Sequence, residues 1–195
     1  MLFDDVFDRN SLIDEPLKNW GKKNKKNIKS IVSSVAPSDK YSKGFPKTLY
    51  DGKRGVAGDY DESWSGWSGW SGIDTLELTV KTRKNNRKIV TISFCHAPDD
   101  WVLSPEQVEV WMPSLNRWVA CTRSTITDEK HGRQRVVFTQ RTPMRDYATP
   151  EGQENDNKDL SKKVKIRIIH PATLPDWHTY KGNKAWLMID EIKTD

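Results

Sequence analysis

The chain has 195 residues, which suits one domain of ordinary size with an appendage. Its 32 basic and 27 acidic residues leave a net charge of +5, and much of that excess comes from lysines between residues 18 and 29. A nucleic-acid-binding protein needs a broader basic stripe, and no apolar run approaches the roughly 18 residues of a membrane span. Cys95 and Cys121 form no Cys-x-x-Cys motif, which argues against a zinc knuckle or a thioredoxin-type site. We therefore expect no nucleic acid partner and no membrane span.

Residues 1–27 are predicted to be an N-terminal appendage, and residues 28–195 the compact domain. The tract GKKNKKN at 21–27 has the polar, Gly- and Asn-containing composition of a linker. Acidic residues stand near the amino terminus, where a signal peptide carries basic residues and an apolar run. We therefore expect that the protein is not exported, or that the chain is a fragment of a longer exported protein.

Residues 51–72, DGKRGVAGDYDESWSGWSGWSG, form the most unusual stretch of the chain. Trp64, Trp67 and Trp70 recur at every third position, between serines and glycines. A period of three matches neither a helix nor a strand, so the sequence predicts an ordered loop that packs large rings at one end of a sheet. At least two of the rings are predicted to be buried, as aromatic side chains mostly are. The alternative is that one ring stays exposed as a stacking platform for a flat ligand.

Most of the remaining chain shows the two-residue alternation of β-strands. The clearest case is residues 163–168, where Val164, Ile166 and Ile168 alternate with basic residues. Asn85 and Asn86 are predicted to form a hairpin tip between two such strands. The pattern predicts an all-β, antiparallel sandwich with an irregular excursion at 141–162. The predicted strands cover residues 31–35, 73–80, 90–94, 108–112, 117–123, 135–139, 163–168 and 185–189.

Glu191 is an unusual residue of the last strand, because it has the inward parity of Leu187 and Ile189. A buried carboxylate without a partner costs several kcal/mol. We therefore expect Glu191 to meet a cation or a basic group, or to lie where the strand has left the core. Asp51, in a tight Asp-Gly turn, is a natural second oxygen donor for calcium. Pairing of Glu191 with an arginine, or its exposure at the strand end, is an equal alternative.

Several motifs occur in an order that resembles one protein family. They are Leu49-Tyr50-Asp51-Gly52-Lys53-Arg54-Gly55, Trp64-Ser65-Gly66-Trp67, Asp100-Trp101-Val102, Pro105-Glu106-Gln107-Val108-Glu109-Val110, Leu174-Pro175-Asp176-Trp177-His178 and Ala185-Trp186-Leu187-Met188-Ile189-Asp190-Glu191-Ile192. The series resembles the discoidin-like or coagulation-factor type C domain, also called galactose-binding domain-like. More narrowly, it is similar to the version at the C-terminus of bacterial beta-hexosaminidases and related glycan-degrading proteins. The resemblance implies an eight-stranded jelly-roll β-sandwich.

The resemblance also implies one structural calcium ion near the Asp-Gly turn and the final strand. Its ligands would be the side chains of Asp51 and Glu191, with the backbone carbonyls of Leu49 and Arg54 as further donors. Many carbohydrate-binding relatives place a threonine just after this turn, and the chain has no clear match for it. Asp59 is the expected substitute.

Sugar-binding members of the wider family bind at loops at one end of the sandwich. A pyranose offers an apolar C–H face to an aromatic ring and hydroxyls to fixed polar groups. The candidates here, in order of preference, are Trp177 with His178 and Tyr180, then Trp101, then Trp64 and Tyr60. The resemblance also allows Trp101 and the Trp177–His178 pair to support the fold instead.

The sequence thus predicts a non-catalytic carbohydrate-binding or accessory module that is associated with glycan degradation. The alternative is a structural domain that packs against a glycoside hydrolase without binding sugar. An enzyme is not expected, because Asp59, Asp61 and Glu62 are adjacent in one loop and no second carboxylate is placed across a cleft from them. The histidines have no Ser or Cys partner at a recognisable spacing. The resemblance implies a periplasmic or extracellular location, with a glycan or a neighbouring hydrolase domain as partner.

Overall fold

The structure is a computed structural model that describes residues 27–53, 55, 60, 66–83, 89–128, 133–141 and 162–194. The strands in these ranges are β1 (Ile28–Ser33), β2 (Ser68–Ser71), β3 (Thr75–Thr82), β4 (Ile89–His96), β5 (Gln107–Met112), β6 (Arg117–Ala120), β7 (Thr122–Asp128), β8 (Arg133–Arg141), β9 (Lys163–Ile169) and β10 (Trp186–Thr194). Short 3-10 helices are η1 (Asp39–Tyr41), η2 (Lys47–Leu49), η3 (Pro98–Asp100) and η4 (Pro113–Leu115). Among the described residues, no helix has the length and apolar character that crossing a membrane requires.

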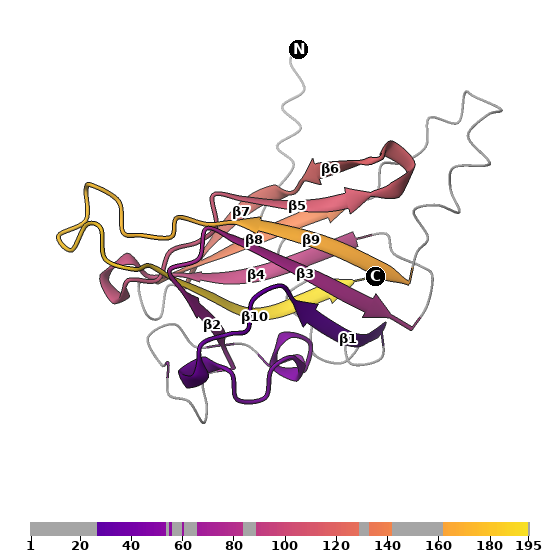
Figure 1. The fold of residues 1–195 in the computed structure, drawn as a ribbon, viewed down its shortest axis with the longest axis horizontal. Helices are drawn as coiled ribbons and strands as arrows, with labels where there is room; N and C mark the ends of the chain where they lie inside the picture. The colour runs from indigo at the N-terminus through magenta and orange to yellow at the C-terminus, as the bar shows by residue number, and fades with distance from the viewer. Residues whose placement is uncertain are drawn as a thin grey trace, which may run out of the picture.

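Two antiparallel sheets of five strands each form a sandwich (Figure 1). One sheet has the strand order β1-β3-β9-β5-β6, and the other has the order β2-β10-β4-β8-β7. The predicted all-β antiparallel sandwich is therefore confirmed, with ten strands in the described residues where the family resemblance implies eight. The side-chain amide of Asn27 donates a hydrogen bond to the Thr194 carbonyl at 2.7 Å, so residues at the two ends of the described chain lie side by side.

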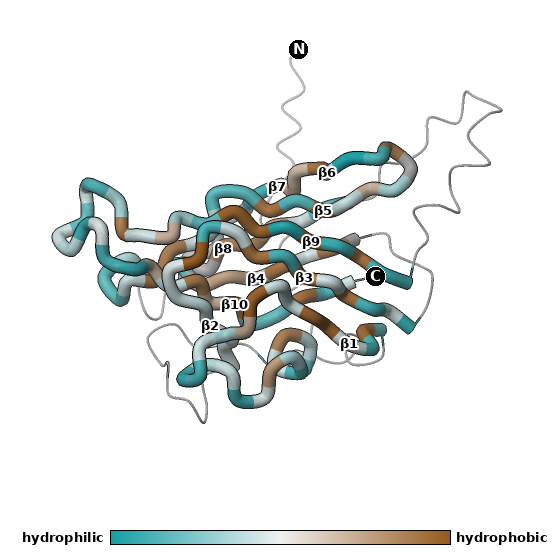
Figure 2. The backbone as a smooth tube through the Cα atoms, in the orientation of Figure 1, coloured by the Kyte–Doolittle hydropathy of each residue, from teal (hydrophilic) through white to brown (hydrophobic). Residues whose placement is uncertain are grey.

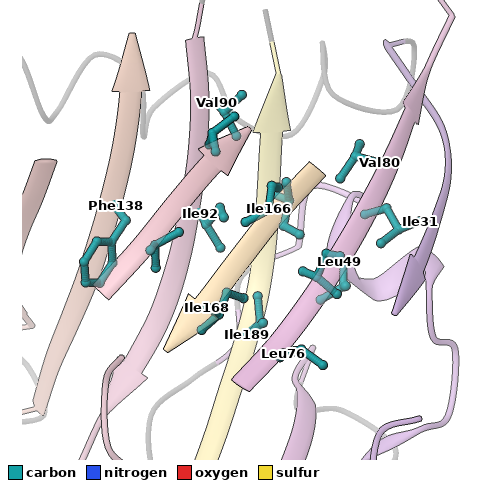
Figure 3. Close-up of a cluster of buried hydrophobic side chains, with 14 of the residues drawn as sticks. Ile31, Leu49, Leu76, Val80, Val90, Ile92, Phe138, Ile166, Ile168 and Ile189 are labelled. Carbon is teal, nitrogen blue, oxygen red and sulfur yellow. The ribbon is translucent and has the colours of Figure 1, made fainter. Parts of the chain in front are cut away.

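The hydrophobic core fills the space between the two sheets. In Figure 2, hydrophobic and hydrophilic residues alternate along β3 and β9, and the hydrophobic ones are buried. Figure 3 shows Ile166 and Ile168 from one sheet gathered in one cluster with Ile92 and Ile189 from the other. Phe94 and Phe138 pack edge to face with their ring centroids 5.7 Å apart. Each such side chain contributes about 1.5–3 kcal/mol by burial, so the core accounts for the fold of a chain whose cysteines are free thiols.

The predicted hairpin at Asn85 and Asn86 is wrong. β3 pairs with β1 and β9, whereas β4 pairs with β10 and β8, so these two consecutive strands lie in opposite sheets. An alternating strand has the same sequence pattern whether its partner is the next strand or a distant one, and the pattern therefore cannot assign the pairing. Residues 84–88, which connect the two strands, lie outside the described residues.

The Trp-Ser-Gly repeat ends in a strand, where the sequence predicts a loop. This strand is β2, which pairs with β10. Because side chains alternate along a strand and three is an odd spacing, Trp67 and Trp70 lie on opposite sides of the sheet. Trp70 is 1% exposed and lies in the core between the sheets, and Trp67 is 3% exposed and packs on the outer side. The predicted burial of two rings is confirmed, and Trp64 lies outside the described residues.

The outer side of β2, β10 and β4 is covered by other parts of the same chain. Tyr41 of η1, Trp67, Met188 of β10 and Cys95 of β4 form a second buried cluster there. Gly69 allows this close packing, since a Cβ at this position would lie 2.7 Å from Met188 Sδ and 2.9 Å from Tyr41 Cδ2. This part of the sheet is therefore buried on both faces.

Gly55 packs against the Trp67 indole, and a Cβ on Gly55 would lie 2.1 Å from Trp67 Cε2. Gly55→Ala is expected to lower the free energy of unfolding by about 1–3 kcal/mol, as overpacking does. Urea unfolding measures this loss. The control is Lys53→Ala, at an exposed position of the same loop, which should stay within about 0.5 kcal/mol of the natural chain. Equal stability of the two variants would contradict the packing.

Candidate functional site

Two loops at one end of the sandwich hold most of the candidate sugar-binding residues. Residues 97–106 connect β4 to β5, and residues 170–185 connect β9 to β10 and form the orange lobe at the left of Figure 1. The first loop is tied to the start of β10. The Trp186 N–H donates to the Trp101 carbonyl at 2.8 Å, and the Leu103 N–H donates to the Trp186 carbonyl at 3.0 Å. Backbone hydrogen bonds therefore fix this loop to the sandwich.

Four rings from these loops form what we call the loop aromatic cluster, which consists of Trp101, Trp177, His178 and Tyr180. The ring centroids are 5.7 Å apart for Trp177 and His178, 6.1 Å for His178 and Tyr180, and 5.4 Å for Tyr180 and Trp101. Trp177 is 69% exposed and Tyr180 is 55% exposed. Large aromatic rings that gather at the surface are typical of a binding site.

His178 joins the two loops through both of its ring nitrogens. Its Nδ1 accepts a hydrogen bond from the Tyr180 N–H at 3.0 Å, and its Nε2 donates to the Pro98 carbonyl at 2.9 Å. Because a backbone N–H only donates and a carbonyl only accepts, these contacts define the neutral Nε2–H tautomer. His178 therefore orients Trp177 and Tyr180, and it would offer a ligand its ring face and not a hydrogen bond.

Trp101 is a half-buried member of the loop aromatic cluster. It takes the left-handed backbone conformation, with φ of 64°, at the end of η3. This conformation costs about 1–2 kcal/mol for a residue with a side chain, so surrounding contacts must hold it. They include the buried Leu103, Leu174 and Ala185. Trp101 thus supports the fold as well as the cluster.

Tyr60 lies on another side of the first loop. Its hydroxyl donates to Asp100 Oδ2 at 3.2 Å, and its ring packs on the second buried cluster, which contains Trp67 and Met188. Tyr60 therefore stabilises η3 through Asp100. Within the described structure it packs on the second buried cluster and is not part of the loop aromatic cluster. Trp64, the remaining candidate, lies outside the described residues.

A polar group at the end of β4 is a feature that the sequence analysis misses. His96 Nδ1 accepts a hydrogen bond from the Ser104 N–H at 3.2 Å, and Arg123 donates to Ser104 Oγ at 3.1 Å. Burial lowers the pKa of His96 below its ordinary value, and the nearby Arg123 guanidinium lowers it further. A neutral His96 thus anchors the loop that carries Trp101. No sequence spacing marks these three positions, since only the fold brings them together.

The predicted inward parity of Glu191 is wrong, because β10 contains a β-bulge. The register between β10 and β4 shifts between Ile189 and Glu191. One extra residue reverses the side-chain alternation, so Ile192 returns to the core and Glu191 points to the outer side of the sheet. Glu191 is fully buried there.

Two neighbouring carboxylates of β10 hold the loop that begins with the Asp-Gly turn. The Gly52 N–H donates to Glu191 Oε2 at 3.1 Å, and the Gly55 N–H donates to Asp190 Oδ2 at 3.1 Å. The expected meeting of the turn with Glu191 is therefore present, although a bulge and not simple parity produces it. Asp190 is a second buried carboxylate, and no sequence pattern marks it, because its outward parity, which it shares with Met188, is equally that of an exposed residue.

The predicted calcium ligands lie only partly within the described residues. Asp51 is half-buried, and its Oδ1 accepts a hydrogen bond from the Lys53 N–H at 2.8 Å. Leu49 is buried at the end of η2, whereas Arg54 and Asp59 lie outside the described residues. In the part of the chain that the structure describes, no group of three or more His, Cys, Asp or Glu side chains is arranged to hold a metal ion. A site here would therefore also need backbone carbonyls.

No protein-family model matches the chain, and no curated protein matches it. A similar solved structure is a mutant of a Ruminococcus gnavus GH29 fucosidase in complex with fucose, with a TM-score of 0.37 and 13% sequence identity. The match covers 88% of this chain and 25% of the fucosidase chain, so this chain spans about a quarter of the length of that protein. A similarity of this extent carries no argument about function.

The partly buried His96 predicts that mild acid destabilises the domain. A proton on Nδ1 would remove the acceptor of the Ser104 N–H. Because the pKa of His96 is lower in the folded chain than in the unfolded chain, the unfolded chain binds more protons at mildly acidic pH. The stabilising contribution is complete above the unfolded pKa of about 6.5, and it is lost as the pH falls towards the folded pKa.

The variant His96→Asn isolates this contribution, since it keeps an acceptor near the position of Nδ1 but does not titrate. Between about pH 8 and about pH 5.5, a range that spans the ordinary histidine pKa, the variant should lose less free energy of unfolding than the natural chain. Urea titrations at both pH values measure the two losses. Equal losses would show that His96 does not cause the acid sensitivity.

Proposed function

We propose that the chain is a non-catalytic glycan-binding module whose site is the loop aromatic cluster. The observation that supports this most strongly is Trp177, which is 69% exposed and lies against His178, the residue that joins the two loops. A pyranose packs its C–H face on an indole and directs its hydroxyls to nearby polar groups. The exposed Tyr180 and the exposed Asp176, next to Trp177 in the chain, supply such groups.

Such a site is expected to bind weakly. One ring and two hydrogen bonds supply about −4 kcal/mol, which corresponds to a millimolar dissociation constant. Weak binding is still useful when the module is linked to an enzyme, because it raises the effective concentration of the enzyme near a polymeric substrate. The proposal therefore includes a glycan-degrading enzyme as neighbour, in the periplasm or outside the cell, as the resemblance of the motifs implies.

The alternative is a structural domain that packs on a neighbouring hydrolase and binds no sugar. The exposed Trp177 and Tyr180 would then belong to an interdomain contact, because exposed apolar patches also mark protein interfaces. The same rings suit both functions, so a binding measurement is needed to separate them.

The proposal also includes a structural calcium ion at the Asp-Gly turn. Asp51, Asp190 and Glu191 are hard oxygen donors of the kind that calcium prefers, and the last two are fully buried where the loop meets β10. Both buried carboxylates already accept hydrogen bonds from Gly52 and Gly55. A calcium ion beside them would offset more of the cost of burying two negative charges.

Trp177→Ala should abolish the binding of neutral glycans, which the loop aromatic cluster is proposed to take, and leave the stability of the domain nearly unchanged. The substitution removes the stacking surface, whereas a side chain that is 69% exposed contributes less than about 0.5 kcal/mol to folding. A glycan array with calcium and with a chelator identifies the ligand of the natural chain, with galactose- or hexosamine-containing glycans as the expected hits. The array is then repeated with the variant.

Leu115→Ala is the matched control, because Leu115 is also exposed but lies in η4, on the other side of the molecule from the orange lobe in Figure 1. It should bind as the natural chain does. A blank array with a folded natural chain would reject glycan binding in favour of the structural domain. A large loss of stability in Trp177→Ala would show that this ring supports the fold.

Glu191→Gln tests the calcium ion, since the amide lacks the charge that a divalent cation needs. If calcium binds, the melting temperature should fall below that of the natural chain only when calcium is present, because a ligand stabilises the folded state that binds it. Thermal unfolding with calcium and with a chelator measures this difference. Glu77→Gln, at an exposed position of β3, should show no calcium-dependent change. Equal losses in Glu191→Gln under both conditions would mean that calcium plays no part.

A further inference from the structure

The outer face of the sheet β1-β3-β9-β5-β6 carries a second group of aromatic side chains. We call it the outer tryptophan face, and it consists of Trp111 on β5, Trp118 on β6, Glu109, Lys165 and Arg167. Trp111 and Trp118 lie opposite each other in the β5–β6 ladder. Their ring centroids are 5.6 Å apart with an interplanar angle of 71°, and both rings are half-buried. Each ring therefore keeps part of its surface in contact with solvent.

Arg167 contacts the Trp118 ring, and its own position is fixed by Glu109. Its guanidinium lies over the Trp118 ring, 4.4 Å from the ring centroid, and its Nε donates to Glu109 Oε2 at 2.7 Å. Glu109 Oε1 accepts a further hydrogen bond from Gln107 at 2.7 Å. Side chains fixed in this way lose little freedom when a ligand arrives, which favours binding.

The same face carries excess positive charge. Lys163, Lys165 and Arg167 alternate with buried residues of β9, so all three point outward. Lys81 of β3 lies opposite Lys163, and Glu77 lies opposite Arg167. Because Arg167 is neutralised by its ion pair with a carboxylate, the positive charge that this face offers a ligand comes mainly from Lys81 and Lys165, which outnumber Glu77.

The strand ladder brings a lysine next to a tryptophan. β5 and β9 pair as far as Val110 opposite Ile166, and Trp111 and Lys165 are the next residues along these strands. Side chains opposite each other in antiparallel strands have Cβ atoms about 4.5–5.5 Å apart. An aromatic ring and an ammonium group therefore border the same patch of solvent.

We propose that the outer tryptophan face is a second binding site, which takes a polysaccharide with carboxylate or sulfate groups. Trp111 and Trp118 contact the C–H faces of the sugars, and Lys165 with the neighbouring Lys81 contacts the anionic groups. Charge complementarity selects an acidic glycan over a neutral one. This site shares no residue with the loop aromatic cluster and does not depend on its function.

A single-stranded nucleic acid would also combine rings with charges, but the geometry favours a glycan. A base stacks on an open ring face, whereas one face of Trp118 is covered by Arg167 and the two indoles meet edge to face. Tighter binding of a nucleic acid is one outcome of the test.

The experiment measures the affinity of the full chain for heparin and for polygalacturonate at low and moderate salt. Dextran is the neutral glycan, and oligodeoxythymidylate is the nucleic acid. Lys165→Glu and Trp111→Ala change the proposed face, and Lys165 is exposed, so its substitution leaves the fold intact. Trp177→Ala controls for the loop aromatic cluster. A variant with serines in place of the lysines of residues 22–26 controls for that basic tract.

We expect an acidic polysaccharide to bind more tightly than dextran and oligodeoxythymidylate. Lys165→Glu should weaken its binding about tenfold and Trp111→Ala about two- to tenfold, with no change in Trp177→Ala. Unchanged affinity in Lys165→Glu would overturn the proposal, as would equal or tighter binding of dextran or oligodeoxythymidylate, or loss of binding only in the variant of residues 22–26. The glycan array at the loop aromatic cluster is read separately, so either site can fail alone.

Discussion

Burial of β10 on both faces is the constraint on which the rest of the structure depends. Its inner side chains, such as Leu187, lie in the core between the sheets, and Met188 lies in the second cluster with Tyr41 and Trp67. A strand that is apolar on both sides needs a cover on its outer side, and Tyr41 of η1 supplies it together with Tyr60 and Trp67. The cover fits closely, because Gly55 and Gly69 leave room for the rings that pack against them.

The bulge in β10 links this cover to the strand by polar contacts. It places Glu191 on the same outer side as Asp190, where the backbone N–H groups of Gly52 and Gly55 reach the two carboxylates. Buried carboxylates are costly unless they accept hydrogen bonds or meet a cation. The loop therefore stabilises the charges of the strand, and the strand in turn determines the path of the loop.

The same strand also decides which surfaces of the molecule are available for binding. Its first residue, Trp186, is hydrogen-bonded to Trp101 and Leu103, so the loop aromatic cluster is built on the start of β10. The outer side of the β10 sheet is occupied by the covering segments, whereas the outer side of the opposite sheet leaves Trp111 and Trp118 half-exposed. Aromatic rings are thus accessible at one end of the sandwich and on one of its faces.

The sequence by itself determined most of the strands, the sandwich class and the loop that carries Trp177, because alternating burial and loop composition are local properties of the chain. It did not mark β2 or the break between β6 and β7. It also indicated that the Asp-Gly turn meets Glu191. Only the tertiary structure decided the bulge in β10, the tautomer of His178 and the place of β3 and β4 in opposite sheets. These features depend on hydrogen bonds between residues far apart in the chain, and the same local pattern is compatible with several such pairings.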